Sequence, residues 1–306
     1  MAQIEFEVSL EQHKMRLDLL LAQVALAQDL GLSRTNIQKL IREGKVVLNS
    51  RSVSKPHLKV SQNDRIKINL WEKKAVEFLP EEIALDVVYE DNDLAIINKQ
   101  IGLVVHPAPG NREHTLVNAL LNRFKELSNI NPGRPGIVHR LDKETSGLIV
   151  IAKNNVSHLK LAKQFAEHSI ARKYIALVSG RVEFDEDIIE APIGRHPLRR
   201  KDMAVSFREN NKYAKTQYHT LKRSNNFSFL ELRPFTGRTH QLRVHLAYLG
   251  YPILGDTKYG KQTNFPRLAL HAQEIGFIHP TSGKLISFTS KIPAVMQDFI
   301  KQNFKS

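Results

Sequence analysis

The chain has 306 residues, with 45 Lys and Arg against 31 Asp and Glu, a formal net charge of +14 and no cysteine. The lack of cysteine excludes disulfides, thiolate catalysis and cysteine-ligated zinc, so any chemistry must use oxygen and nitrogen groups. A large positive charge favours polyanionic partners, nucleic acid above all, although basic proteins can also be merely well solvated. Since no leader pattern and no run of about eighteen apolar residues occurs, we expect a cytoplasmic monomer with no membrane partner.

The first part of the chain predicts a small unit of two helices followed by strands. Ser33 can cap the second helix, Gly44 closes it, and residues 46–48 begin a strand. Arg34, Gln38 and Arg42 step by four residues along this helix, so they form a polar stripe that can lie on phosphates. The first helix is indicated by apolar residues at helical spacing, namely Leu17, Leu20, Leu21 and Val24.

Two domains are predicted, because a densely charged stretch with Pro80 interrupts the pattern before a strand-like run at Ile83. We place the first domain at residues 1–75, with its core at 15–69, the linker at 76–82 and the second domain at 83–306. By our count the two domains carry about +5 and about +9, so both are expected to contact a polyanion.

The second domain predicts a mixed α+β fold around one large sheet, because strand-like runs outnumber helical ones. The strand-like runs are residues 94–99, 148–152, 174–178, 227–232 and 285–289. The helical runs are residues 115–127, 156–168 and 239–249.

The run HRLDKETSGLIVIAK, residues 139–153, places one carboxylate, Asp142, before turn residues and a continuous apolar strand. Such a carboxylate can be a catalytic group on a rigid mount or only a turn cap. The stretch from Asp142 to Tyr174 can hold one strand, one helix and a turn, which would return the chain to the same sheet edge. The sequence therefore allows Tyr174 to face Asp142.

The motif R-L-D-K-x-T-S-G-L resembles the signature of the RluA-type pseudouridine synthases, and ARKYIALVSG and TGRTHQLRVHLAYLGYPILGDTKYG resemble their second and third motifs. The resemblance implies that Asp142 is the catalytic residue, that Tyr174 lies against the uracil, and that Arg238 pairs with Asp142. It also implies that Arg140 enters the RNA stack when the target base is flipped out. We add the neighbouring His139 to the expected substrate contacts.

Residues 15–69 resemble the S4 RNA-binding domain, with Ser50 at a position where that family usually has Gly. On this resemblance Arg34, Gln38 and Arg42 are expected to contact RNA. The fold implied is α+β, with a catalytic domain on a large mixed, mainly antiparallel sheet, preceded by a small α/β S4 domain.

The implied reaction breaks the bond from ribose C1′ to N1 of uracil and joins C1′ to C5, with nothing oxidised and no group acquired. We therefore expect no cofactor and no metal, and interpret His240 and His245 as structural histidines. Further segments such as IGRHPLRRKDMAV resemble those members of the family that act on large-subunit (23S) ribosomal RNA. This resemblance implies a target in the helix 69 stem-loop, whose loop bases need little energy to be flipped out. Three alternatives stay open: a synthase for other rRNA or tRNA uridines, a non-catalytic S4-type assembly factor, and a hydrolase of N-glycosidic bonds.

Overall fold

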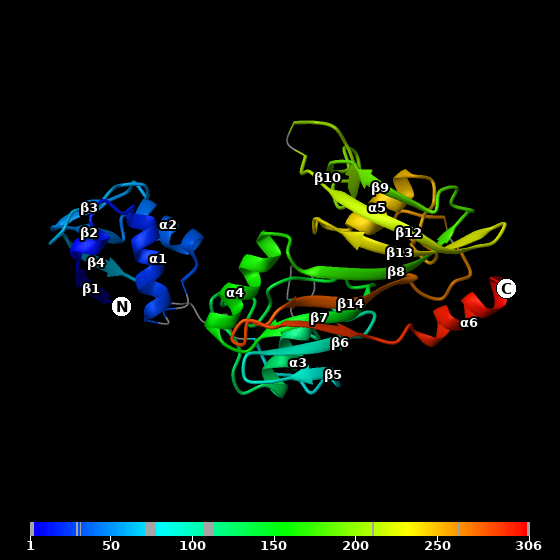
Figure 1. Ribbon diagram of the computed structural model, residues 1–306, viewed down its shortest axis with the longest axis horizontal. Helices are drawn as coiled ribbons and strands as arrows, with labels where there is room; N and C mark the ends of the chain where they lie inside the picture. The colour runs from blue at the N-terminus through cyan, green and yellow to red at the C-terminus, as the bar shows by residue number, and fades with distance from the viewer. Residues whose placement is uncertain are drawn as a thin grey trace.

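The computed structural model contains two units with separate hydrophobic cores (Figure 1). The first core is built from residues between Phe6 and Leu70, and the larger second core from residues between Phe78 and Phe304. The structure describes residues 3–28, 30, 32–70, 78–106, 113–209, 211–261 and 263–304.

The first unit packs two helices on a four-stranded antiparallel sheet of order β1-β4-β2-β3. Ser33 caps α2 by accepting a hydrogen bond from the backbone N–H of Asn36 at 3.3 Å, and Gly44 ends the helix at φ +70°. Asn49 and Ser50 connect β2 to β3 at φ +46° and +67°, so serine takes the left-handed conformation without glycine. The elements are β1 (Gln3–Glu7), η1 (Leu10–Gln12), α1 (Leu17–Ala27), α2 (Arg34–Arg42), β2 (Val46–Leu48), β3 (Arg51–Val53) and β4 (Arg65–Asn69).

The expected end of the first domain and start of the linker fall at residues 71–77, which lie outside the described residues. The remainder of the expected linker is tied to the second unit. Asn118 donates its side-chain amide to the carbonyl of Leu79 at 2.8 Å, and Glu81 N–H donates to the carbonyl of Asn118 at 3.1 Å. Residues 78–82 therefore pack as part of the larger unit.

The second unit is built on a nine-stranded sheet of order β5-β6-β7-β14-β8-β13-β12-β9, with β15 added on β14. Every pairing in it is antiparallel except that of β7 with β14, so the expected large, mixed and mainly antiparallel sheet is confirmed. The elements are β5 (Asp86–Glu90), β6 (Leu94–Lys99), α3 (Leu116–Arg123), β7 (Ser146–Ala152), α4 (Asn155–Ala166), β8 (Ala171–Ser179), β9 (Glu186–Glu190), β10 (Ile193–Arg195), β11 (Met203–Val205), β12 (Lys215–Arg223), β13 (Phe227–Pro234), α5 (Gln241–Tyr248), β14 (Leu270–Ile278), β15 (Leu285–Thr289) and α6 (Ala294–Asn303).

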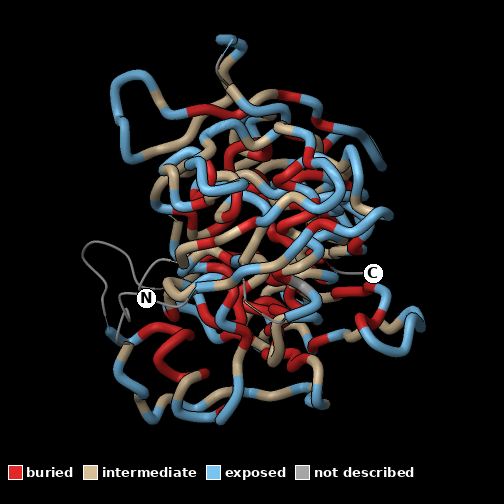
Figure 2. Tube along the Cα trace, turned by 90° about the vertical axis from the view of Figure 1, so that its left-hand side faces the viewer, coloured by how far each residue is buried: buried red, intermediate tan, exposed pale blue. Residues whose placement is uncertain are grey.

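Strand β7 is buried along its whole length, as its unbroken apolar run predicted. Alternate side chains enter different cores: Ile149 joins the main cluster, whereas Leu148 and Val150 join a second cluster on the opposite face. Figure 2 shows that buried stretches of the chain run through the interior of the molecule, with exposed residues at its periphery. The strand is thus a rigid support for the loop that precedes it.

Strand β14 separates β7 from β8, although β8 follows β7 in the sequence much more closely (Figure 1). It pairs with β7 in parallel over two residue pairs, Ser146 with His271 and Gly147 with Ala272. On its other side it pairs with β8 in antiparallel, where Ala272 faces Tyr174. The two segments expected to share a sheet edge therefore approach each other across a third strand.

The part of the chain that the structure describes contains no helix both long and apolar enough to cross a membrane.

Candidate active site

A pocket with about 100 Å³ of space lies between the loop before β7, strand β8 and the segment that leads into α5. Four of the residues predicted to form the site line it: Arg140, Asp142, Tyr174 and Arg238. Sequence reasoning did not assign Arg172, His240 and Arg243 to this pocket, which they also line.

Asp142 lies at the mouth of the pocket, with its side chain 16% exposed. Its backbone carbonyl accepts a hydrogen bond from Thr145 N–H at 3.1 Å, which closes the turn before β7. Its Oδ1 lies 3.9 Å from Nε2 of His240. The carboxylate is thus held on a turn with a solvent-accessible face, as a group that meets a substrate requires.

Lys99, at the end of β6, supports the loop that carries Asp142. Lys99 is 1% exposed, and its Nζ donates to the carbonyls of Gln100 and Leu103 at 2.9 Å and of Lys143 at 3.3 Å. Burial lowers the pKa of Lys99 to about 8, against the opposing effect of the Asp142 charge. The sequence signal for this role of Lys99 is a lysine at the end of an otherwise apolar strand.

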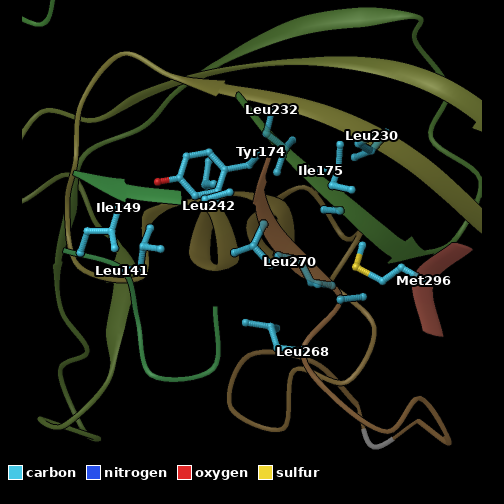
Figure 3. Packing of buried hydrophobic residues seen from close by; sticks show 14 of the residues in the cluster. Leu141, Ile149, Tyr174, Ile175, Leu230, Leu232, Leu242, Leu268, Leu270 and Met296 are labelled. Atoms are coloured by element: carbon cyan, nitrogen blue, oxygen red, sulfur yellow. The ribbon is translucent and has the colours of Figure 1, made fainter. Parts of the chain in front are cut away.

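Tyr174 projects from β8, and Figure 3 shows its ring beside Leu242 with the hydroxyl directed away from Leu230 and Met296. Its residue is 9% exposed, and its hydroxyl makes no hydrogen bond to a described residue. Burial raises the pKa of the Tyr174 phenol, so it keeps its proton at neutral pH. The ring offers a stacking surface and the hydroxyl a free donor in the pocket.

Arg238 lines the pocket without the expected ion pair to Asp142. Its Nε donates to the carbonyl of Tyr213 at 3.0 Å, and its backbone N–H donates to Gln241 Oε1 at 2.9 Å. Among the described residues, His240 is the basic group within 4.0 Å of the Asp142 carboxylate. The carbonyl of Tyr213 draws the Arg238 guanidinium to itself, so this part of the expectation differs from the structure.

Arg140 and His139 are adjacent in sequence but differ in surroundings. Arg140 is exposed and lines the pocket, where a side chain could enter an RNA stack. His139 accepts a hydrogen bond from Val150 N–H at 3.0 Å on Nε2, and its ring stacks on Phe165 with centroids 4.4 Å apart. Burial lowers the pKa of His139 to about 3, so it is neutral. It joins β7 to α4 and does not line the pocket, contrary to the substrate contact expected of it.

In the first unit, the polar stripe of α2 is partly occupied by Asp18, which sequence reasoning missed. This carboxylate is fully buried and accepts hydrogen bonds from Arg34 at 2.7 Å, Gln38 at 2.8 Å and Arg16 at 3.0 Å. Burial alone would raise the pKa of Asp18, but these hydrogen bonds outweigh it and lower the pKa to about 2. Arg42 is exposed in the last turn of α2.

One cluster of potential metal ligands occurs in the described ranges, formed by Asp91, Asp93 and His279. His279 accepts hydrogen bonds on Nδ1 from the N–H groups of residues 281 and 282, so its Nε2 carries the proton and donates to Asp91 at 2.9 Å. Asp91 also accepts from Tyr89, and Asp93 from two side chains of the α4 N-terminus. The ligand atoms of these three residues are already engaged in hydrogen bonds within the protein, so the cluster does not fit a metal ion.

Comparison with known proteins shows the family to which the chain belongs. Residues 93–248 match the family model of the RNA pseudouridylate synthases, and residues 15–66 match that of the S4 domain. A relative from Bacillus subtilis (strain 168), "Uncharacterized RNA pseudouridine synthase YlyB", is 41% identical over 98% of both chains. The chain belongs to the RNA pseudouridylate synthase family. It is therefore an RNA pseudouridine synthase, an isomerase with an N-terminal S4 RNA-binding domain.

Two further family members show how far the likeness extends. "Ribosomal large subunit pseudouridine synthase D" of Zymomonas mobilis is 42% identical, covering 88% of this chain and 89% of its own. The solved structure of "Human RNA Pseudouridylate Synthase Domain Containing 1" is 28% identical, with a TM-score of 0.57, covering 68% of this chain and 83% of its own. The sequence likeness spans nearly the whole chain, whereas this structural likeness covers about two thirds of it.

Proposed function

We propose that this synthase isomerises loop uridines of the helix 69 stem-loop in 23S ribosomal RNA, with Asp142 as its catalytic residue. The single observation that carries the catalytic assignment is that Asp142 and Tyr174 line the same pocket, together with several arginines. The choice of RNA is supported by relatives named ribosomal large subunit pseudouridine synthase D, at 42% and 40% identity.

In this proposal the pocket residues divide the reaction among them. The Asp142 carboxylate acts at the ribose, by attacking a sugar carbon or stabilising its developing positive charge, as the C1′–N1 bond breaks. The electron pair of the C1′–N1 bond leaves with the uracil, which rotates against the ring of Tyr174. C5 then bonds to C1′ and releases the carboxylate from any bond it has made to the sugar; C5 loses its proton and N1 gains one. The free Tyr174 hydroxyl can assist that proton movement.

Recognition of the target follows from charge and from base flipping. Arg140 is exposed at the pocket and fills the gap that the extruded base leaves in the RNA stack. Arg172 and Arg238 line the same pocket and bring positive charge to the backbone around the flipped nucleotide. Loop uridines suit this site, because their bases are already poorly stacked.

Asp142→Asn tests the catalytic assignment, since it removes a charge while keeping the shape. Purified variant and helix 69 RNA are incubated with no metal or cofactor added, and pseudouridine is mapped by chemical modification and primer extension. We expect the product to fall below detection while RNA affinity stays within about threefold of wild type. Asp187→Asn, exposed on edge strand β9, is the matched control and should retain turnover. Turnover by Asp142→Asn would refute the role of Asp142.

The target is tested in cells that lack the gene. Loss of helix 69 pseudouridines, restored by wild type and not by Asp142→Asn, is the expected result. If those positions persist and a tRNA pseudouridine disappears instead, the ribosomal assignment is wrong.

The S4 domain is expected to add affinity rather than chemistry, because its core is separate from that of the catalytic unit. Deletion of residues 1–75 should weaken RNA binding and reduce the slope of log affinity against log salt, since phosphate contacts are lost. Filter binding at several salt concentrations measures both quantities. Unchanged affinity at moderate salt would contradict this role.

A further inference from the structure

His240 lies between the Asp142 carboxylate and the half-buried Tyr259. Its Nε2 lies 3.9 Å from Asp142 Oδ1, and its Nδ1 lies 2.6 Å from the hydroxyl of Tyr259. The backbone of His240 has φ +56°, a left-handed conformation that is strained for a residue other than glycine. The surrounding fold must therefore hold His240 in this place, at the N-terminus of α5.

The hydroxyl of Tyr259 determines which nitrogen of His240 carries the proton. Its oxygen accepts a hydrogen bond from Met203 N–H at 3.0 Å. Within the described part of the chain, His240 Nδ1 is the acceptor that remains for the hydroxyl proton. Burial lowers the pKa of His240, partly opposed by the charge of Asp142, so the ring is neutral at pH 7. Its single proton then lies on Nε2, the nitrogen that faces Asp142.

Tyr259 is itself fixed by a buried ion pair. Asp256 accepts hydrogen bonds from Arg243 Nε and Nη2, both at 2.8 Å, and from Tyr259 N–H at 3.1 Å. Asp256 and Arg243 are 1% and 3% exposed, and the Arg243 guanidinium lies 5.2 Å from the centre of the Tyr259 ring. The tyrosine thus has little freedom to turn away from His240.

We propose that His240 is a positioning residue for Asp142, with Tyr259 fixing its tautomer so that Nε2–H is directed at Oδ1 and the other oxygen is left for the ribose. This inference rests on the proposed catalytic role of Asp142. At 3.9 Å the pair is too long for a hydrogen bond, and an approach of about 1 Å would form one. Contacts of this kind commonly tighten when substrate binds. No proton is transferred: the imidazole N–H orients the carboxylate and favours its ionised form.

Several titratable groups surround His240, so its environment is not set by Asp142 alone. They come from the loop before β7, from α5 and from the segment before β14, and they are Asp142, Glu144, Arg243, Lys258 and Tyr259.

Three variants test this role: His240→Ala, His240→Gln and Tyr259→Phe. We expect His240→Ala and Tyr259→Phe to lower kcat by about tenfold to a hundredfold, with KM within about twofold. His240→Ala removes the N–H that faces the Asp142 carboxylate, and Tyr259→Phe removes the hydroxyl that fixes the His240 tautomer. The acidic limb of the kcat profile should move toward neutral pH, since the carboxylate loses a donor that favours its ionised form. His240→Gln should recover part of kcat, because its amide N–H can donate near the position of Nε2.

Controls separate positioning from general damage and from failure of the proposed function. Tyr248→Phe, exposed on α5, should leave kcat and the pH profile unchanged, and thermal unfolding checks that each variant folds. Tyr259→Phe keeps the ring and removes only the hydroxyl, so it remains informative if His240→Ala unfolds. Turnover by Asp142→Asn would refute the proposed catalytic role of Asp142, on which this inference rests.

If Asp142→Asn is inactive but Tyr259→Phe and His240→Gln keep wild-type kcat and pH profile, the positioning role is overturned. It is also overturned if kcat falls with no movement of the acidic limb and no recovery in His240→Gln, because a merely structural histidine would behave in that way.

Discussion

Gly147→Ala should destabilise the catalytic unit severely, because Gly147 lies where β7 and β14 pair in parallel. Its φ is +113°, which L side chains rarely adopt. An added Cβ would lie 2.2 Å from the carbonyl oxygen of Ala272, 2.6 Å from its nitrogen and 2.7 Å from its carbonyl carbon. All three atoms are backbone, so no side-chain rotation can relieve the overlap.

Two contributions set the size of the effect. The backbone conformation alone costs about 1–2 kcal/mol for a residue with a Cβ. Relief of the overlap requires the strands to move apart by about 1 Å, which disrupts a parallel ladder of only two residue pairs inside a close-packed core. Together we expect a loss of more than about 4 kcal/mol in the free energy of unfolding. Turnover should fall as well, because β14 joins the Asp142 loop to the strand of Tyr174.

Urea unfolding of the full chain, followed by circular dichroism, measures the loss. Gly102→Ala is the matched control, because Gly102 has φ +85° but no heavy atom within 4 Å of an added Cβ. It should lose only the conformational part, about 1–2 kcal/mol. If the two variants unfold within about 1 kcal/mol of each other, the steric reasoning for β7 and β14 is refuted.

Three further substitutions test other parts of the structure. Asp18→Asn should lower the free energy of unfolding by about 1–2 kcal/mol at pH 7. The pKa of Asp18, lowered from 3.8 to about 2, corresponds to about 2.4 kcal/mol, and solvent screening reduces this value because the side chain of its partner Arg34 is 48% exposed. This stabilisation exists above about pH 3.8 and is lost as pH falls through about 2, so urea titrations in which the difference from wild type persists at pH 2 would contradict it. Lys99→Met should lower stability by about 1–3 kcal/mol and also kcat, because three carbonyls lose their donor. Since burial lowers the pKa of Lys99 from 10.5 to about 8, wild type should gain stability relative to Lys99→Met as pH rises from 8 to 10.5, and a difference that shrinks over this range would refute the assignment. His139→Ala should lower the melting temperature but leave RNA affinity within about twofold, because its ring packs on Phe165 and His139 does not line the pocket. A tenfold loss of affinity in filter binding would show that His139 does contact the substrate.

Local pattern was sufficient for the parts of the fold that depend on neighbours in sequence. The unbroken apolar run of residues 148–151 predicted a strand buried on both faces, and Ser33 and Gly44 predicted the two ends of α2. The spacing of the motif around Asp142 also indicated a turn that presents a carboxylate. In each case the signal and the structure lie within about one turn or one strand of the chain, so few distant contacts can change the outcome.

The tertiary structure alone decided which distant segments meet. An alternating or apolar pattern shows that a strand is buried but not which strand lies beside it, so the insertion of β14 between β7 and β8 could not be read from sequence. Side-chain partners depend on the same packing: Arg238 contacts the carbonyl of Tyr213, and His139 packs on Phe165. His240, which the sequence presented as an ordinary structural histidine, lies beside Asp142 because α5 packs at the edge of the pocket. Sequence thus determined the residue types and their local supports, whereas long-range packing determined their partners.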